Sequence, residues 1–386
     1  MKIRAITVGL APELTTLCKQ IQEAGRFAMH AKEACEKSGV AVQTLRFTTP
    51  PFPLYLQDLR DEGIVAFAEE IEFYCREAGF EYCSLGPVIG REEDRERFFS
   101  LVPYIIAQTS SVFTSAVLDE EDIKRRRLAS LQIAKVIRAI ALATEGGFGN
   151  LRFAALVHCP AHIPFFPASY HEGEAAFAFA LEAADVVRAV CRPEKSWDEI
   201  AENLAREFER QVLPLQRVGE ALAPLGFVFR GVDLSPAPGP DPEASIVYAL
   251  EGFGAGRFGE PGTLAVAGLM TSVLKTTRLQ TCGYCGLMLP VLEDVGLAER
   301  NNQGLLRLMN LLAYSAVCGT GLDTIPLPGD ASEHQLAALL SDVATLGGKL
   351  QKPLSARLLP IPGKRAGEMT EFDFPYFVNT KVMELL

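Results

Sequence analysis

The densest group of reactive side chains lies between residues 315 and 330, where the sequence reads SAVCGTGLDTIPLPGD. An apolar helical pattern over 305–317 runs into Cys318, a Gly-Thr-Gly turn follows, and Asp323 stands in the short strand-like segment after it. A thiol acts as a nucleophile when a neighbour lowers its pKa, and a carboxylate can bind a ligand or transfer a proton. We therefore predict that Cys318 and Asp323 are catalytic. The alternative for Cys318 is a buried, inert packing residue.

Three histidines, His158, His162 and His171, follow a predicted strand over 151–159 and lie in one loop. Imidazole is a common ligand of zinc and other transition metals, so a divalent metal ion is a cofactor that this loop could hold. His171 precedes a carboxylate, and an imidazole titrates near neutrality. It is therefore also our candidate for proton transfer. The alternative for all three is an ordinary surface loop.

Polar side chains also stand at the ends of two other apolar segments. Asp233 and Ser235 end a predicted strand over 227–234, and Glu293 follows Leu289-Pro290-Val291. A carboxylate buried without a partner costs several kcal/mol, so each must meet a cation, a hydrogen-bond donor or a ligand. We predict that these three residues bind a ligand. The alternatives are structural capping at Asp233 and an N-cap of the next helix at Glu293-Asp294.

Two motifs resemble well-known binding sites, but the sequence around each of them lacks the features that those sites require. Residues 254–259 match G-x-G-x-x-G, but a helical segment precedes them and no acid stands about 20 residues later, so no dinucleotide is expected. The amides before the helix that starts at Thr263 could still hold an anion, which makes Thr263 a ligand-binding candidate. The lone C-x-x-C at 282–285 has no second pair for a zinc site. Its glycine indicates close packing beside a site, with Tyr284 as a ligand-binding candidate.

Composition excludes several classes of protein. The 386 residues are 48% hydrophobic and 22% charged, which is typical of a globular chain. A net charge of −11 argues against nucleic acid or an anionic membrane as the main partner. The basic run 124–127 follows the acids 119–122 and indicates a solvated helix face. The nine cysteines show no disulfide-like regularity, and no segment suits a signal peptide or a membrane span. We expect a cytoplasmic protein with reduced thiols.

Strand-like and helix-like segments alternate almost from end to end. This order predicts mostly parallel strands with helices outside them, and no linker divides the chain, so one domain over 1–386 is expected. Predicted strands cover 3–10, 42–49, 80–85, 110–118, 151–159, 175–181, 227–234, 286–291, 322–327 and 356–361. Predicted helices cover 13–37, 58–78, 91–108, 120–143, 182–190, 196–225, 263–276, 305–317 and 333–345. The helix over 196–225 should start with Ser196 as N-cap and Glu199 at the third position, with a kink or break at Pro214, and Gly347-Gly348 should cap the helix over 333–345. The helices over 263–274 and 305–317 are apolar beyond one buried face, which favours a homo-oligomer; the alternative is that both helices are simply part of the core.

Taken together, these segments resemble the domain-of-unknown-function 711 family. The matching blocks are Arg4–Gly9, Pro164–His171, Val232–Pro238, Gly262-Thr263, Pro290–Gly296, Cys318–Asp330 and Arg357–Gly363. The resemblance implies a fold similar to the pyruvate formate-lyase barrel, with ten strands in two halves and a cysteine-bearing loop near the centre. It implies no activity. The radical chemistry of that fold does not carry over, because no glycine follows Gly367 to hold a radical. The loop after Ala154 and the segment 281–285 depart from the family pattern.

The sequence therefore predicts a single large α/β barrel of about ten mostly parallel strands. Its predicted function is that of an enzyme acting without a radical on a small polar metabolite in a central cavity. The first alternative is a small-molecule-binding or regulatory protein without turnover. A further alternative is a metal-dependent protein that uses the histidine loop.

Overall fold

Nine strands form one sheet in the computed structural model, which describes residues 1–90, 92–119, 122–317 and 319–385. Cys318 therefore lies outside the described residues. The strand order is β7-β6-β1-β2-β3-β4-β5-β9-β8. The strands are β1 Lys2–Gly9, β2 Val42–Thr48, β3 Tyr82–Val88, β4 Val112–Val117, β5 Phe153–Val157, β6 Ala176–Glu182, β7 Val228–Ala237, β8 Gly321–Pro328 and β9 Leu354–Ile361.

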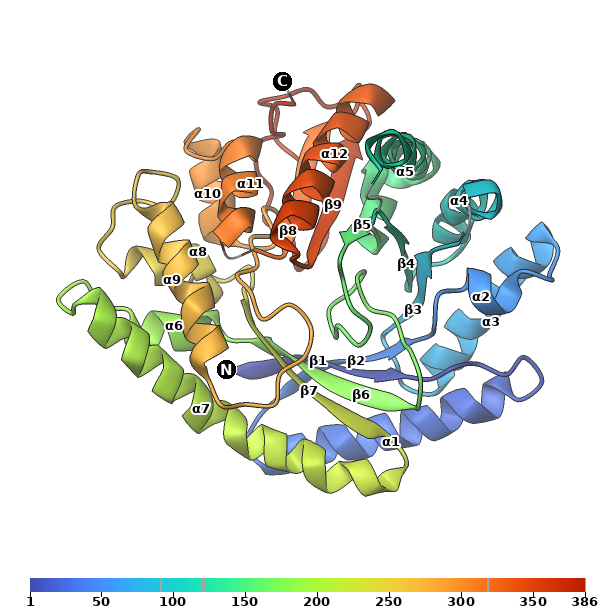
Figure 1. Cartoon of the computed structure of the whole chain (residues 1–386), viewed down its shortest axis with the longest axis horizontal. Helices are drawn as coiled ribbons and strands as arrows, with labels where there is room; N and C mark the ends of the chain where they lie inside the picture. The colour runs from blue at the N-terminus through green and yellow to red at the C-terminus, as the bar shows by residue number, and fades with distance from the viewer. Residues whose placement is uncertain (91, 120–121, 318, 386) are drawn as a thin grey trace.

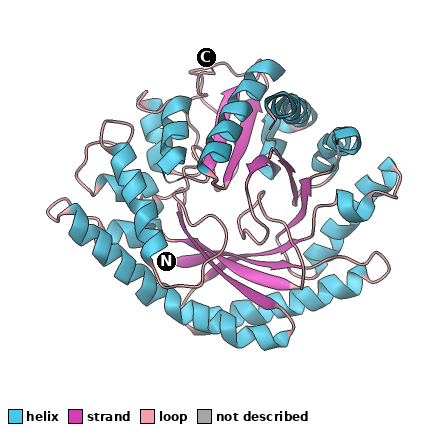
Figure 2. Ribbon diagram, viewed as in Figure 1, coloured by secondary structure: helices cyan, strands magenta, loops and turns pink. Residues whose placement is uncertain are grey.

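The sheet is mostly parallel, as predicted. Strands β1 to β5 run parallel to one another, and β6 and β9 pair antiparallel with β1 and β5. Beyond these two junctions, β7 is parallel to β6 and β8 is parallel to β9. The sheet curves, and the helices lie around its outer side (Figures 1 and 2). The fold class is therefore α/β with a curved, mostly parallel sheet surrounded by helices.

The predicted closure into a barrel is not confirmed, because the sheet has two edge strands, β7 and β8. The predicted strand over 286–291 does not form. That part of the chain makes only isolated bridges, of Leu287 with Gly319 and of Pro290 with Asp323. Pro290 has no N–H for a ladder, and the chain turns immediately after it. A bridge between Thr281 and Val232 ties the preceding residues to β7.

Twelve α-helices occur among the described residues. They are α1 Leu17–Lys37, α2 Pro53–Leu56, α3 Asp61–Glu77, α4 Glu92–Gln108, α5 Ile123–Ala143, α6 Ala184–Val190, α7 Trp197–Leu222, α8 Ile246–Glu251, α9 Thr263–Thr276, α10 Val295–Asn302, α11 Leu308–Val317 and α12 Glu333–Leu350. Short 3₁₀ helices cover Glu145–Arg152, Ala223–Leu225 and Pro242–Ala244. No helix in these described ranges is long and apolar enough to cross a membrane.

Short sequence patterns predicted the bounds of some helices correctly and those of others wrongly. Ser196 and Glu199 form the predicted capping box at the start of α7. A kink or break was predicted at Pro214, and the helix does not break there, because α7 continues to Leu222. Helix α12 likewise continues through Gly347, where an end was predicted. A Cβ on Gly347 would lie 2.6 Å from a Val157 methyl carbon, so this glycine serves close packing of α12 on β5 rather than helix termination.

Two loops lie on the inner side of the curved sheet. The first, residues 158–175, connects β5 to β6, and the second, residues 277–294, connects α9 to α10; both run into the centre of the molecule in Figure 1. Their buried residues Ile163, Phe165 and Met288 belong to an apolar cluster that includes Ala5 of β1 and is separate from the main core. The inner face of the sheet is therefore covered by loops rather than by helices.

Candidate functional site

A cavity of about 240 Å³ lies between the inner face of the sheet and the two inner loops. Its wall has an unusual composition, with many aromatic side chains and several charges. The charged residues on the wall are Arg4, Arg46, Arg152, Arg357, Glu293 and Asp323. The aromatic residues on the wall are Tyr82, Phe113, Phe148, Phe165, Phe166, Tyr284, Phe374 and Tyr376. The wall can therefore bind a ligand through both charge and flat apolar surface.

Five alternating charges, which we name the ion-pair chain, include four side chains of this wall and Glu182, which lies off it. Arg4 donates from Nη1 to Glu182 Oε2 at 2.9 Å and from Nη2 to Glu293 Oε2 at 3.2 Å. Arg357 donates from Nη2 to Glu293 Oε1 at 2.7 Å and from Nε to Asp323 Oδ1 at 2.6 Å. All five side chains are less than one-fifth exposed. Strands β1, β6, β8 and β9 and the second inner loop thus meet at one buried network.

The carboxylates of the ion-pair chain keep Arg357 charged. Burial lowers the pKa of the Arg357 guanidinium, but the carboxylates of Asp323 and Glu293 outweigh burial and hold that pKa above its ordinary value. Arg357 therefore stays charged. Two of the predicted site residues, Asp323 and Glu293, are brought together here, although they are 30 positions apart in the sequence.

Arg46 of β2 lies on the same wall in a different environment. Its Nε donates to Thr44 Oγ1 at 3.0 Å, and this is its only hydrogen bond to the described residues. Its guanidinium carbon lies 5.6 Å from the ring centroid of Tyr82 and 5.3 Å from that of Phe166. Burial is the main cause that lowers the pKa of Arg46, to about 10, which still leaves the group charged at neutral pH. No described carboxylate pairs with it.

Asp233 and Ser235 lie beneath the cavity wall rather than on it. Asp233 is fully buried inside β7, which continues past the predicted strand end to Ala237. It accepts hydrogen bonds from the amides of Tyr284 and Cys285 at 2.7 and 3.0 Å. It also accepts from the Ser235 hydroxyl at 2.6 Å, and that hydroxyl in turn accepts from Gly286 N at 3.1 Å. Burial raises the pKa of Asp233, and these hydrogen bonds oppose the shift. The two residues thus hold the 282–286 turn, which places Tyr284 on the wall.

The thiols near this turn are unreactive in their surroundings. Cys282 and Cys285 are free rather than disulfide-bonded. Burial is the main cause that raises the pKa of Cys285 to about 12, and burial also raises the pKa of Cys282. Cys159 Sγ lies 3.6 Å from the Tyr284 hydroxyl, and burial raises the pKa of this thiol to about 12 as well. These three groups therefore stay protonated at neutral pH and are poor nucleophiles.

The three histidines of the first inner loop do not line the cavity. His171 is fully buried, its Nε2 is 3.0 Å from Gly173 O, and its Nδ1 has no hydrogen-bond partner. Its ring lies 5.3 Å from that of His162, centroid to centroid, whereas His158 lies beside Asp119 at 3.9 Å. Within the described ranges, no group of three or more His, Cys, Asp or Glu side chains is arranged to hold a metal ion.

Acid should destabilise the protein partly through His162. Burial, followed by Arg230 and His171, lowers the pKa of His162 to about 4, against about 6.5 in an unfolded chain. The neutral imidazole thus favours the folded state fully above about pH 6.5, and this contribution is lost as the pH falls towards 4. Because His162 is partly exposed, we expect a loss of about 1 kcal/mol between pH 7 and 4.5.

The measurement is urea unfolding at both pH values, in the wild type and in His162→Asn. Asparagine tolerates the backbone φ of 66° at this position. The variant should lose less unfolding free energy between pH 7 and 4.5 than the wild type. Equal losses in the two proteins would contradict the burial of a neutral imidazole.

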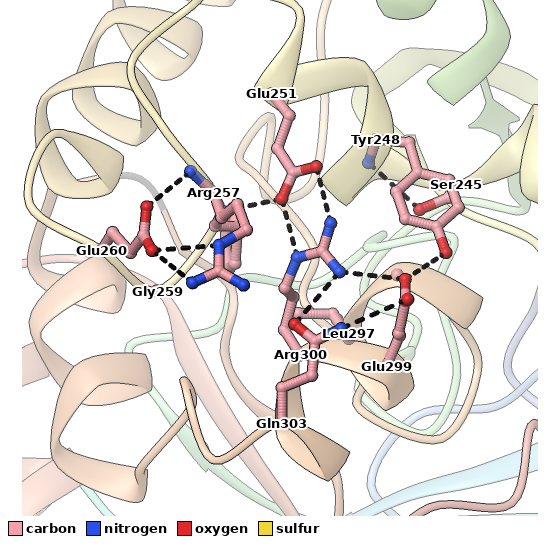
Figure 3. A network of polar contacts seen from close by, with 12 residues as sticks. Ser245, Tyr248, Glu251, Arg257, Gly259, Glu260, Leu297, Glu299, Arg300 and Gln303 are labelled. Atoms are coloured by element: carbon pink, nitrogen blue, oxygen red, sulfur yellow. Dashed lines mark hydrogen bonds and ion pairs between the residues drawn. The ribbon is translucent and has the colours of Figure 1, made fainter.

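Thr263 lies at the start of α9, away from the cavity wall, and closes the glycine-rich loop. Its hydroxyl donates to Glu260 O at 2.9 Å and accepts from Gly259 N at 3.0 Å. Arg257 forms a further ion pair with Glu260 across the same loop at 2.7 Å (Figure 3). The amides of Arg257, Phe258 and Gly259 thus bond to Glu260, to Glu251 of α8 and to Thr263, respectively. Thr263 therefore has a structural role in this structure.

Arg300 of α10 fixes the other side of this loop. It donates twice to Glu251 of α8, from Nε and Nη2, each at 2.8 Å, and it pairs with Glu299 at 2.9 Å (Figure 3). Glu251 also accepts from Phe258 N at 2.7 Å. At the start of α10, Asp294 accepts from Gly296 N and Leu297 N, so it is the N-cap proposed as an alternative for this acidic pair. This region is a scaffold beside the site.

Sequence reasoning missed the arginines of the wall. Arg4, Arg46 and Arg357 each stand inside a strand, among apolar residues of the same segment. A charged residue inside a buried strand is a signal that could have marked them, because such a charge needs a partner or a ligand. Cys318 remains a prediction from the sequence, since it lies outside the described residues.

These features define a class of protein: a mostly parallel, curved α/β sheet with its helices outside and a charged, aromatic-lined cavity on its inner side. Comparison with known sequences then gives the family. The chain belongs to the uncharacterised family DUF711, whose family model, described as "Uncharacterised ACR (DUF711)", matches residues 1–373. The resemblance drawn from the sequence blocks is thereby confirmed.

The similar proteins come from both archaea and bacteria. A UPF0210 protein of Methanopyrus kandleri is 30% identical, over 96% of this chain and 88% of its own length. A UPF0210 protein of Desulforudis audaxviator is 29% identical over the same shares, and one of Listeria monocytogenes is 28% identical over the same shares. Their names state no activity, so function has to be argued from the cavity.

Proposed function

We propose that the chain is an enzyme that acts, without a radical, on a small polar metabolite held in the inner cavity. The observation that carries this proposal is the ion-pair chain on the cavity wall. Buried ion pairs are often no more stabilising than apolar residues of similar volume. Five such charges beside a cavity therefore contribute little to stability by themselves. Binding of a polar ligand would explain why they are present.

The architecture proposed for this enzyme is a single domain over residues 1–386, similar to the pyruvate formate-lyase barrel. Two facts support it. The strands fall into a half of five and a half of four that run in opposite directions. The segment 281–290 bridges to β7 at Thr281 and towards β8 at Pro290, which brings both edges of the sheet to the same piece of chain.

In this proposal, Asp323 and Glu293 contact the polar groups of the metabolite, and Cys318 supplies a nucleophile or a proton. Asp323 Oδ1 is held by Arg357 at 2.6 Å, so the carboxylate is fixed in position. Thr320, two residues after Cys318 in the sequence, lines the cavity. Tyr284, placed by Asp233, lines it too and offers a phenol for hydrogen bonding.

A second function, binding without turnover, is favoured by one specific observation. No histidine lines the wall in the part of the chain that the structure describes. Burial also raises the pKa of the Tyr284 phenol and of the nearby Cys159 thiol, which makes both weak proton-transfer groups at neutral pH. If Cys318 does no chemistry, the cavity is left with binding groups.

The experiment that separates these functions is incubation of the purified protein with a fractionated metabolite extract, followed by mass spectrometry of the bound and free compounds. The variants are Cys318→Ser and Asp323→Asn. Their matched controls are Cys18→Ser on α1 and Asp330→Asn, an exposed residue of the same segment as Asp323. Circular dichroism confirms that each variant is folded.

We expect the wild type and both controls to deplete at least one small polar metabolite and release a product. Both site variants should lose this depletion. A metabolite that is retained unchanged by the wild type, both controls and Cys318→Ser would establish binding without turnover instead. A wild-type protein that neither retains nor depletes any compound would overturn both functions.

A further inference from the structure

We infer that Arg46 is the anion-binding residue of the cavity and that the ligand is a small, flat carboxylate. This inference rests on the proposed function, because it names the class of molecule that the same cavity takes. It is argued from four features of the wall: an unpaired charge, the local charge balance, the orientation of one guanidinium, and the size and chemistry of the hollow.

The first feature is that Arg46 differs from the other arginines of the wall. Arg4 and Arg357 each bind two carboxylates, and Arg152 donates to Thr109 Oγ1 and to two backbone carbonyls, those of Val112 and Ile106. Arg46 has only the bond from Nε to Thr44, so both of its terminal nitrogens lack a hydrogen-bond partner among the described residues. A buried cation without an anion is costly. A bound anion removes that cost.

The second feature is the local excess of positive charge. Four guanidiniums stand on the wall, with only two carboxylates, those of Glu293 and Asp323. The third carboxylate of the ion-pair chain, Glu182, does not line the cavity and also pairs with Lys2 at 2.8 Å. The wall therefore has an excess of positive charge, in a chain whose overall net charge is −11. This excess favours an anion as the ligand.

The third feature is the fixed orientation of the Arg46 side chain. Its guanidinium lies against two rings, those of Tyr82 and Phe166, and its Nε is tied to Thr44. The group is therefore held in place before a ligand arrives. A planar guanidinium with two free terminal nitrogens suits a carboxylate, which it can bind through two parallel hydrogen bonds.

The fourth feature is the rest of the hollow. A cavity of roughly 150 Å³ is enough to bind benzene, so about 240 Å³ can hold one ring with a small charged group. The wall around it is rich in aromatic rings, including Phe113, Phe165 and Tyr284. Such surfaces favour a flat apolar body through stacked or edge-on contacts. The ligand class is therefore a small carboxylic acid with a flat, ring-sized body.

The test is isothermal titration of the ligand-free protein with four probes: benzoate, phenylacetate, benzamide and inorganic phosphate. Benzamide has nearly the shape of benzoate without its charge. The variants are Arg46→Met and Arg46→Lys, and the matched control is Arg210→Met, an exposed arginine of α7. A cavity-filling variant, Ala168→Leu, tests whether binding occurs in the cavity at all.

For the wild type and Arg210→Met, we expect benzoate or phenylacetate to bind at least tenfold more tightly than benzamide. Arg46→Met should weaken carboxylate binding by about 10- to 100-fold, because hydrogen bonds to a charged group are lost. The affinity of Arg46→Lys for carboxylates should lie between those of the wild type and Arg46→Met, since lysine keeps the charge but not the paired donors. Arg46→Met should also unfold at no lower temperature than the wild type without ligand, which separates a binding residue from a structural one.

Three results would overturn the inference. One is equal binding of benzoate and benzamide, the second is tighter binding of phosphate than of either carboxylate, and the third is no binding of any probe. The first two leave the proposed function standing if Ala168→Leu still abolishes binding, because the cavity is then the site and only its ligand class is wrong. If the protein depletes a metabolite but binds none of the four probes, the proposed enzyme function stands and the carboxylate ligand class is wrong.

Discussion

The Arg357→Met variant is expected to lose about 3–5 kcal/mol of unfolding free energy, because it breaks a buried ion pair by removing one partner. Methionine approximates the length of the arginine side chain but none of its donors. The carboxylates of Glu293 and Asp323 would each lose a hydrogen bond of 2.7 Å or less, and both remain more than four-fifths buried. Uncompensated buried charge is the dominant cost.

The matched control for this prediction is Arg46→Met, the same replacement on the same cavity wall. It removes a cation that has no described carboxylate partner, so the relief of burying that charge offsets the lost contacts with Tyr82 and Phe166. Chemical denaturation of both variants without ligand is the measurement. Equal losses of unfolding free energy in the two variants would contradict the prediction, because Arg357, with two carboxylate partners, would then contribute no more to stability than Arg46.

The Gly283→Ala variant is expected to lose about 3–5 kcal/mol and to release Tyr284 from the cavity wall. Gly283 has a φ of 73°, which costs an alanine about 1–2 kcal/mol. Its added Cβ would also lie 2.1 Å from Asp233 Oδ2. The carboxylate would have to move, and buried hydrogen bonds left unmade cost about 1–3 kcal/mol each. Asp233 holds this turn through the amides of Tyr284 and Cys285.

Gly173→Ala is the matched control, because Gly173 has a similar φ of 77° and no atom within 4 Å of the added Cβ. It should lose only the backbone cost of about 1–2 kcal/mol. Urea denaturation gives both values, and the difference in tyrosine fluorescence quenching between each variant and the same variant carrying Tyr284→Phe reports on the exposure of Tyr284. Losses of the same size in both variants would mean that Asp233 does not anchor the turn.

The fold was predictable from the sequence where local chemistry decides the structure. The capping box of Ser196 and Glu199 starts α7, and the apolar pattern over 263–276 gives α9 at its predicted bounds. Signals failed where tertiary packing overrides them. Pro214 lies within a continuous α7, and Gly347 packs against Val157 instead of ending α12.

The strand prediction for 286–291 failed for a related reason. Apolar composition indicates burial, and burial is correct here, since Leu287, Met288 and Leu289 are all buried. A ladder requires in addition a partner in register along the segment, and only isolated bridges form. Composition reports the environment of a segment, whereas strand pairing depends on residues far away in the sequence.

The candidate site was predictable only in part. The acids at 293 and 323 marked the cavity, and both line it, although Asp323 lies inside β8 and Glu293 lies in the second inner loop. Arg46 was missed because the alternation of polar and apolar residues over 42–49 does not say whether the polar face meets solvent or a hollow. His171 also follows a strand, yet it is fully buried away from the wall. Its proposed proton transfer remains a prediction from the sequence.

The most direct test of the account is a crystal structure of the protein purified without denaturation, examined for electron density of a co-purified small molecule. The account predicts density for a flat molecule in the inner cavity, with a carboxylate within hydrogen-bond distance of the terminal nitrogens of Arg46. Its other polar groups should face Asp323 or Glu293. A small molecule bound elsewhere on the chain, or an uncharged group facing Arg46, would contradict the account.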